Sequence, residues 1–278
     1  MQNKAVGYTR TMDSVIVVDV GGSWVRFANC SRDYQISDLV RLKKPQTVEG
    51  FSKLLADYLD KHPFKDVVIA IAGLTDGKRQ LVKTSRRVAW GDVEFSKFID
   101  RQKYELRLHI INDAQAGAFS VAARNFQKIE RWVYVAIGTS IGIGYVDIKN
   151  PGVIENSEAG HMLIGEKSWE QIAAGPAFLD HFDCKASAAT QEQWREYANL
   201  FAPGLWNSVA ILQPEMVFIG GGVGQYLSHS GIDQIGKLFE NWNSMAGDVV
   251  IQPKIRVIAN ADQANLIGAG QTYFTMIK

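Results

Sequence analysis

The chain has little cysteine, no excess of charge of either sign and no long apolar run. Cys30 and Cys184 are its only cysteines, which excludes a disulfide framework, and no Cys-x-x-Cys pair predicts a structural zinc site. The 30 basic residues balance 29 acidic ones, so the formal net charge is +1. This balance gives no electrostatic footprint for nucleic acid or an anionic membrane, so a bound polyanion must be small.

No apolar run is long enough to cross a bilayer, and the first 14 residues lack an apolar segment, which predicts neither membrane insertion nor export. With so few cysteines, a reducing cytoplasm is the expected compartment. The composition, 46% hydrophobic and 21% charged, is typical of a folded globular chain. Its 278 residues suffice for one large domain or two smaller ones.

Strands alternate with helical segments along the chain. Apolar runs predict strands at 15–20, 24–30, 67–72, 106–111, 132–137, 216–219 and 255–259. Helical spacing predicts helices at 48–59, from about 94, at 114–123, at 192–212 and from about 263. The glycine-linked strands at 15–30 are echoed at 132–148, which predicts a duplicated α/β architecture with a cleft between the halves.

Three glycine turns each follow a buried strand. Their residues are Gly21, Gly22 and Ser23; Gly138, Thr139 and Ser140; and Gly220, Gly221 and Gly222. Glycine lets backbone N–H groups approach an anion and a hydroxyl adds a donor, so these turns suit phosphate oxygens, although any single one could be an ordinary tight turn. Asp19 precedes the first turn as either a turn cap or a ligand of Mg²⁺, held directly or through water.

Motifs of other enzyme classes fit poorly. The chain contains no Gly-x-x-x-x-Gly-Lys-Ser/Thr and no complete Gly-x-Gly-x-x-Gly, which argues against P-loop enzymes and common dinucleotide-binding dehydrogenases. Residues 138–142 match the Gly-x-Ser-x-Gly pattern of serine hydrolases. That pattern must lead into a helix, whereas the alternation after Ser140 predicts a strand, so the match is accidental.

Asn112 and Asp113 end a buried strand where a helix begins, which suits either ligand contact or a helix N-cap. A carboxylate such as Asp113, near a hydroxyl nucleophile and a terminal phosphate, is the general base of a kinase. Glu158 and His161 flank a glycine in a loop; a lone histidine is usually structural, but this one has an acidic neighbour. Glu170 lies in a segment typical of a solvated helix face that ends at Gly-Pro.

In their order along the chain, these motifs resemble the bacterial glucokinases and the wider ROK family of sugar kinases. Asp19 to Arg26 resembles the family's first phosphate motif, and smaller matches lie in its first sugar loop around Gly73 and in its closing helix at 265–270. The other motifs are similar to the second phosphate motif (138–142), the catalytic Asn-Asp pair (112–113), the Glu-x-Gly-His sugar motif (158–161), the segment around Glu170 (169–176) and the adenosine turn (220–222).

The resemblance implies a two-lobed actin-like ATPase fold, which is ribonuclease H-like, with a duplicated βββαβα core and a central cleft. The smaller N-terminal lobe would comprise residues 1–112 and 265–278, and the larger C-terminal lobe residues 113–264. The implied activity is that of an ATP- and Mg²⁺-dependent hexose kinase, in the first place a glucokinase, acting on the sugar's 6-hydroxyl. A cytoplasmic homodimer is also implied.

The resemblance also implies a role for each site residue. Asp113 would be the general base. The sugar would contact Asn112, Asp113, Glu158, His161, Glu170 and Gly73. ATP would be bound by Asp19, Gly21, Gly22, Ser23, Arg26, Gly138, Thr139, Ser140, Gly220, Gly221 and Gly222, with Asp19 at the Mg²⁺.

Three departures from the family pattern qualify this expectation. Many ROK proteins hold zinc with a histidine and following cysteines, but no cysteine follows His161 before Cys184, so zinc is not expected. Ser23 replaces a threonine and keeps its hydroxyl. Residues 85–87 read Ser-Arg-Arg where glucokinases tend to have Thr-Asn, which leaves N-acetylmannosamine, allose and fructose open as acceptors. A non-catalytic sugar sensor is the alternative from another class; a lost base or phosphate turn would indicate it, and neither is lost.

Overall fold

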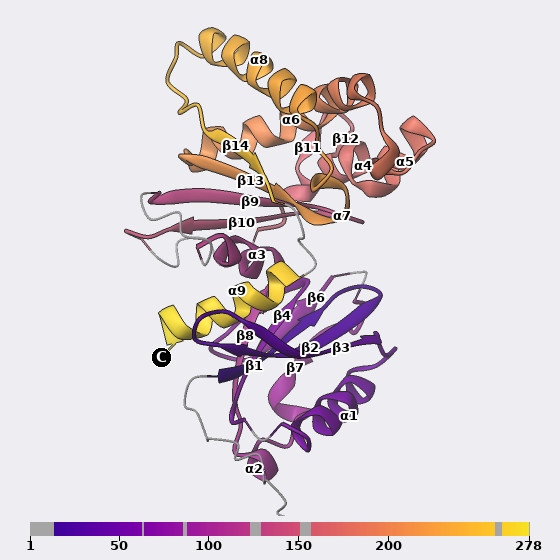
Figure 1. Cartoon of the computed structure of the whole chain (residues 1–278), viewed down its shortest axis with the longest axis vertical. Coiled ribbons are helices and arrows are strands. Elements are labelled where there is room, and N and C mark those ends of the chain that lie inside the picture. Colours follow the sequence, from indigo (N-terminus) through magenta and orange to yellow (C-terminus); the bar gives the residue numbers. More distant parts are fainter. Residues whose placement is uncertain are drawn as a thin grey trace, which may run out of the picture.

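The computed structural model describes residues 14–62, 64–85, 88–122, 129–150, 157–258 and 263–277 (Figure 1). It has two α/β lobes, one built on strands that precede residue 113 and one on strands that follow residue 130. Two helices, α3 (Asp113–Ala122) and α9 (Ala264–Thr272), lie between the lobes. Within the described residues, no helix combines the length and apolar character needed to span a bilayer.

The N-terminal lobe is built on a five-stranded sheet in the order β3-β2-β1-β4-β8. The strands are β1 (Ser14–Val20), β2 (Trp24–Ser31), β3 (Ile36–Lys43), β4 (Asp66–Ile71) and β8 (Arg107–Asn112). The first three pair antiparallel, and β4 and β8 add in parallel. Every residue of β4 is buried, because both faces of the sheet are covered; its sequence is therefore almost continuously apolar.

Helix α1 (Val48–Leu59) covers the face of this sheet that points away from the other lobe. The Thr47 hydroxyl caps the helix by accepting from the backbone N–H of Gly50. The rings of Phe51 and Tyr58 stack on Phe27 of β2, with centroids 6.1 and 5.4 Å away. The predicted bounds of this helix, 48–59, are confirmed.

A small sheet of β5 (Gly73–Asp76), β6 (Leu81–Thr84) and β7 (Asp92–Glu94) follows β4. The helix expected from about residue 94 is wrong. Phe95–Lys97 forms a single 3-10 turn, and α2 is limited to Arg101–Tyr104. Buried Phe95 and Ile99 anchor this segment, while the Asp100 carboxylate accepts from the N–H of Lys103 and starts a new turn instead of continuing the first.

The C-terminal lobe repeats the same plan. Its sheet has the order β10-β9-β13-β14, formed by β9 (Arg131–Ile137), β10 (Ile141–Asp147), β13 (Met216–Gly220) and β14 (Lys254–Val257). β9 and β10 pair antiparallel, and β13 and β14 add in parallel, as β4 and β8 do in the first lobe. The predicted duplication is thus confirmed, although the described part of this sheet has one antiparallel pair where the first sheet has three antiparallel strands.

Helices dominate the outer side of this lobe. They are α4 (Trp169–Ala173), α5 (Gly175–Phe182), α6 (Gln191–Leu212), α7 (Gly221–Gly224) and α8 (His229–Met245). The remaining pieces are β11 (Leu163–Ile164), β12 (Lys167–Ser168), the 3-10 turns Ala159–His161 and Ala186–Ala188, and the π-helix Tyr273–Ile277. Gly175 and Pro176 open α5, whereas the sequence indicated that they end a helix; proline is well suited to the first turn because it lacks an N–H there.

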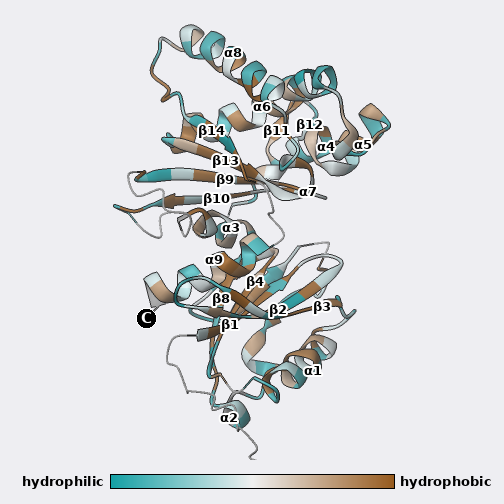
Figure 2. Ribbon diagram, in the orientation of Figure 1, coloured by the Kyte–Doolittle hydropathy of each residue, from teal (hydrophilic) through white to brown (hydrophobic). Residues whose placement is uncertain are grey.

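The core of the C-terminal lobe lies between its sheet and α6. Figure 2 shows hydrophobic residues concentrated along the strands of both sheets, whereas hydrophilic residues are frequent on the outer helices. Gly204 of α6 lies against the indole of Trp169, where a Cβ would come within 2.2 Å of the ring. Trp169 is fully buried and donates to the carbonyl of Phe201 at 3.0 Å. This packing fixes α4, and with it the segment that carries Glu170, against α6.

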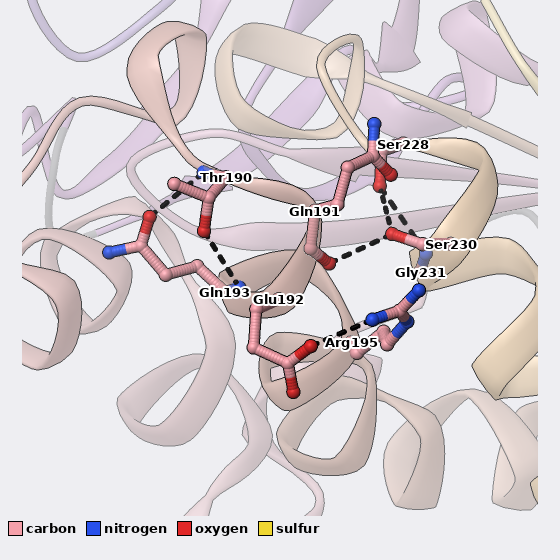
Figure 3. A network of polar contacts seen from close by, with 8 residues as sticks. All are labelled: Thr190, Gln191, Glu192, Gln193, Arg195, Ser228, Ser230 and Gly231. Carbon is pink, nitrogen blue, oxygen red and sulfur yellow. Dashed lines mark hydrogen bonds and ion pairs between the residues drawn. The ribbon is translucent and has the colours of Figure 1, made fainter.

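The first turns of α6 and α8 are held together by a polar network (Figure 3). Thr190 and Gln193 form a reciprocal capping box, with bonds of 3.2 and 2.9 Å. The Ser230 hydroxyl donates to the carbonyl of Gln191 at 2.8 Å and lies 2.8 Å from the Ser228 hydroxyl, which caps α8. These contacts fix the relative position of the two outer helices.

The lobes join where α3 and α9 cross. A Cβ on Gly268 of α9 would lie 1.6 Å from the carbonyl oxygen of Ala116 in α3. Gly117 of α3 lies against the Tyr134 ring, where a Cβ would come within 2.4 Å. Since atoms cannot approach so closely, a side chain at Gly268 would force the two helices apart, and one at Gly117 would force α3 away from β9.

We expect Gly268→Ala to lower the free energy of unfolding by at least about 2 kcal/mol, since the added methyl overlaps the backbone of α3. Urea unfolding followed by circular dichroism measures the change. Gly236→Ala in α8 is the matched control: nothing lies within 4 Å of its Cβ position, so the same substitution should stabilise by about 0.5–1 kcal/mol. Equal effects at the two positions would contradict the close crossing.

Candidate active site

Strand register brings the predicted residues of the N-terminal lobe to one edge of its sheet. Val20 of β1 pairs with Ile71 of β4, and Ile71 pairs with Asn112 of β8. The carboxyl ends of the three parallel strands therefore meet at this edge. Asp19, Gly73 and Asp113 lie within two residues of those ends.

The three glycine turns follow strands, as predicted. In the first turn, the N–H of Gly21 donates to the carbonyl of Trp24 at 3.0 Å, while Gly22 and Ser23 are exposed. The second turn, between β9 and β10, is closed by a bond of 2.9 Å from the N–H of Gly138 to the carbonyl of Ser140. Thr139 at its tip is exposed. The strand that follows this turn confirms that the Gly-x-Ser-x-Gly match is not a hydrolase elbow.

The second and third turns contact each other. Gly221 has a φ of +86°, and a Cβ there would lie 2.6 Å from the carbonyl of Ile137. On the other side, the N–H of Gly175 donates to the carbonyl of Gly138 at 2.7 Å. These contacts join the second glycine turn to the start of α5 and to the start of α7.

A pocket of about 330 Å³ adjoins this junction. It is lined by Gly175, Phe178, Leu179, Cys184, Lys185, Ala186, Ser187, Gly222, Val223 and Tyr226. Its walls combine apolar and aromatic side chains with a few polar ones, as small-ligand pockets do. Among these lining residues, the sequence analysis assigned only Gly222 to ligand binding. Residues 178–187 carry no motif that could have indicated that they line a pocket.

Asp19 has a donor on each of its oxygens. Arg26, its cross-strand partner on β2, donates from Nη1 to Oδ2 at 2.6 Å, and the Asn265 amide of α9 donates to Oδ1 at 3.0 Å. The Asp19 residue is only 3% exposed, so its charge needs these partners. The sequence predicted a role for Arg26 in ATP binding; the structure pairs it with Asp19. The sequence places Asn265 only in the closing helix, and nothing in the sequence indicates its partner.

The side chain of Asn112 connects the start of α3 to Gly73. Its side-chain oxygen accepts from the N–H groups of Ala114 and Gln115 at 3.0 and 3.1 Å, which caps α3. Its amide nitrogen donates to the carbonyl of Gly73 at 2.9 Å. Gly73 itself has a φ of +142°, and a Cβ there would lie 2.4 Å from the carbonyl of Lys83. The predicted first sugar loop is thus fastened to the residue before Asp113; Arg86 and Arg87 of that loop lie outside the described residues.

Asp113 begins α3, and its Oδ1 accepts from the N–H of Ala114 at 2.8 Å. Burial raises the pKa of its carboxyl group to about 7, and the negative charge of Asp19 adds to the increase, with a smaller effect from Glu158. A carboxyl group whose pKa is near neutrality can both accept and release a proton under physiological conditions. It therefore has the property required of a general base.

Glu158, His161 and Glu170 gather at the start of the C-terminal lobe's helical side. His161 lies 3.6 Å from Glu158 through Nε2 and 3.6 Å from Glu170 through Nδ1. A Cβ on Gly160 would lie 2.3 Å from the carbonyl of Ile141, so this glycine lets the turn reach β10. Burial raises the pKa of Glu158, and its partner His161 partly offsets this. The three side chains offer donors and acceptors to a polyhydroxylated ligand.

The acidic residues of the site are spread over several elements. No group of three or more His, Cys, Asp or Glu that could hold a metal ion occurs in the part of the chain that the structure describes. A Mg²⁺ ion at Asp19 would therefore take its other ligands from phosphate oxygens and water, which is the usual arrangement for this ion.

Comparison with known proteins agrees with this geometry. Residues 15–273 match the ROK family. A glucokinase from Aeropyrum pernix is 26% identical over 186 residues, which cover 63% of this chain and 57% of that protein. A polyphosphate glucokinase from Mycobacterium tuberculosis is 23% identical over 214 residues, covering 74% of this chain and 76% of that protein. The first alignment thus spans little more than half of the relative's length.

A solved structure confirms the expected fold. The ROK family glucokinase from Streptomyces griseus, determined in complex with glucose and AMPPNP, superposes with a TM-score of 0.75 at 21% identity. The superposition covers 92% of this chain and 98% of that chain. The fold is therefore that of the ROK sugar kinases, the actin-like ATPase fold. The exact lobe boundaries predicted from the sequence stay a prediction.

We expect Asp113→Asn to stabilise the protein above pH 7 and to have no such effect below pH 4. The folded carboxyl group has its pKa raised to about 7 from 3.8, so the folded state holds a proton that the unfolded state has lost between these values. Stability from this group therefore falls as the pH rises through that window, and the amide avoids the loss. Asp113 is partly exposed, so solvent screening reduces the effect of its charge. We expect the substitution to raise the free energy of unfolding by about 1–2 kcal/mol at pH 8.

Urea unfolding at pH 3.5 and pH 8 measures this difference. Asp180→Asn is the control, because it removes the same charge from an exposed position on α5. An Asp113→Asn effect that is the same at both pH values would contradict the raised pKa.

Proposed function

This chain belongs to the ROK family, and we propose that it is an ATP-dependent hexose kinase whose acceptor is glucose. The proposal rests chiefly on Asp113, a carboxyl group whose pKa is raised to about 7 at the end of a parallel strand. Glucose would place its 6-hydroxyl next to this group. Asp113 would accept the hydroxyl proton as the oxygen attacks the terminal phosphate of ATP.

Backbone N–H groups would hold the phosphates. The exposed residues Gly22, Ser23 and Thr139 lie at the tips of the first two turns, where donors can face an anion. The pocket of about 330 Å³ beside Gly222 has the size and apolar walls to take the adenosine of ATP. A donor without a nucleoside, such as polyphosphate, would leave this pocket without an occupant, which favours ATP.

The donor would enter as its magnesium complex. Asp19 fits such a complex, because a carboxylate beside a phosphate turn is favourable only when a cation lies between the two anions. Arg26 already supplies one positive charge to Oδ2, and carboxylate lone pairs beyond those used by Arg26 and Asn265 are available to a metal or its waters. The ion would withdraw charge from the phosphate oxygens.

The sugar would be held by directional hydrogen bonds. Glu158 and Glu170 each lie 3.6 Å from the imidazole of His161, and Gly73 belongs to the other lobe. Several such contacts can fix a polyhydroxylated ligand in one orientation, which is the main task in a phosphoryl transfer. N-acetylmannosamine, allose and fructose are the alternative acceptors. The homodimer and the cytoplasmic location stay predictions from the sequence.

Sugar kinase activity can be tested by coupled ADP release with Mg-ATP. The panel is glucose, mannose, fructose, allose, N-acetylglucosamine and N-acetylmannosamine. We expect glucose-dependent release, and we expect Asp113→Ala to lower kcat by about a hundredfold or more because it removes the carboxylate that would accept the hydroxyl proton. Sugar binding by calorimetry should be weakened but measurable in this variant.

Two outcomes would redirect the proposal. A near-normal kcat in Asp113→Ala would refute the base assignment. Sugar binding without ADP release anywhere on the panel would favour the non-catalytic sugar sensor. Asp180→Asn, at an exposed carboxylate, should leave kcat unchanged.

The phosphate donor can be tested at Gly222. Nothing lies within 4 Å of its Cβ position, and the residue lines the pocket, so Gly222→Leu should fill part of the nucleoside space. We expect the KM for ATP to rise about tenfold or more while the Kd for the sugar stays unchanged. Gly236→Leu, equally open but on α8, is the control. An unchanged KM for ATP in Gly222→Leu would show that the pocket does not bind the nucleoside of the donor.

A further inference from the structure

Asn265 of α9 forms a hydrogen bond with Asp19 of β1 that links two distant parts of the sequence. Its side chain reaches from the first turn of α9 to Oδ1 of Asp19, across 246 positions of sequence. Its side-chain oxygen lies near α3, 3.4 Å from where a Cβ on Gly117 would be. Asn265 thus stands between the strand that leads into the first phosphate turn and the helix that begins with Asp113.

The direction of this hydrogen bond is fixed by chemistry. Asp19 can only accept when ionised, so the amide must present its nitrogen to the carboxylate and its oxygen to α3. Asn is the shortest side chain that can donate from one atom while turning an acceptor the other way. An Asp in this place would set a second carboxylate beside Asp19.

The contact also determines how Asp19 is oriented. Arg26 alone would hold one oxygen and leave the carboxylate free to turn about the bond to its Cβ. A second donor on the other oxygen fixes the plane of the group. Because Asp19 is only 3% exposed, water cannot readily replace a donor that is removed.

We propose that Asn265 is a positioning residue for the phosphoryl donor: through its bond to Asp19 Oδ1, it holds the Asp19 carboxylate in the orientation that receives the magnesium–nucleotide complex. The proposal rests on the proposed function, since it assigns the first turn to the donor. It also makes donor affinity depend on α9, the helix that returns from the C-terminal lobe to pack between the lobes.

The test is calorimetric binding of Mg-AMPPNP, which needs no turnover. We expect Asn265→Ala to raise its Kd about tenfold, the loss of one hydrogen bond to a charged group, and to leave the Kd for glucose unchanged. Asn265→Asp, which keeps the shape but exchanges the donor for a charge, should weaken binding at least as much. Thermal unfolding shows whether each variant is folded. If Asn265→Ala is not folded, the Kd of Asn265→Asp for Mg-AMPPNP decides the test.

A double-mutant cycle separates positioning from general support. In the Asp19→Asn background, where the carboxylate is absent, Asn265→Ala should change the nucleotide Kd by less than about twofold. The control is Asn243→Ala: this 8% exposed residue of α8 accepts from the N–H of Val250 at 3.0 Å, far from the site. It should lower stability and leave the nucleotide Kd unchanged.

The outcomes are distinguishable from failure of the proposed function. If the unaltered protein binds no Mg-AMPPNP, the proposed function itself fails. If it binds but Asn265→Ala binds equally well, or if the Asn265→Ala effect persists in full without the Asp19 carboxylate, only the role of Asn265 is overturned.

Discussion

The close crossing of α3 and α9 is the constraint on which the rest of the site depends. Gly268 brings α9 so near to α3 that a Cβ would lie 1.6 Å from the carbonyl of Ala116. Gly270, two residues further, places α9 against Cys30 of the N-terminal sheet, where a Cβ would lie 2.2 Å from the sulfur. Since Asp113 opens α3 and Asn265 lies in the first turn of α9, this contact helps to set the position of Asp113 relative to the Asp19 carboxylate.

Negative charge accumulates at this crossing. Burial raises the pKa of Asp113 to about 7, and the negative charge of Asp19 adds to the increase, with a smaller effect from Glu158. Such a site is stable only because its carboxylates have partners: Arg26 and Asn265 for Asp19, His161 for Glu158. The proposed phosphate donor would add further negative charge, which the glycine turns and a cation would have to compensate. The proximity of Asp19 to Asp113 therefore supports the proposal that the donor enters as its magnesium complex.

Local signals in the sequence predicted the parts of the site that lie on regular elements. The helix at 48–59 has a capping threonine and apolar residues at helical spacing, and both ends are found where predicted. The segment after Glu94 has two buried anchors, Phe95 and Ile99, and their spacing imitates a helix that tertiary contacts break into short turns. Periodicity reports which side chains are buried, but it does not report what the backbone does between them.

Long-range pairs could not be predicted from spacing. The partner of Asp19 on one side is Arg26, seven residues away across a hairpin, and the register of that hairpin would have revealed it. The partner on the other side, Asn265, is 246 residues away and depends on the packing of α9. Much of the wall of the pocket around Gly222 comes from residues 178–187, whose sequence has neither a motif nor a periodicity that indicates a ligand. These features exist only after the two lobes have formed.

A chain of hydrogen bonds links the predicted sugar loop to the start of α3, where Asp113 lies. Gly73 of the predicted sugar loop accepts from Asn112, whose oxygen caps α3 beside Asp113. Two residues further along α3, Gln115 exchanges two hydrogen bonds with the backbone of Tyr145 in the C-terminal lobe, at 2.8 and 3.1 Å. A displacement of the predicted sugar loop would therefore be passed through Asn112 to the start of α3, and through Gln115 to the C-terminal lobe. Under the proposed function, a substitution that accommodates another sugar at Gly73 would also shift Asp113, so sugar specificity and proton transfer would be coupled.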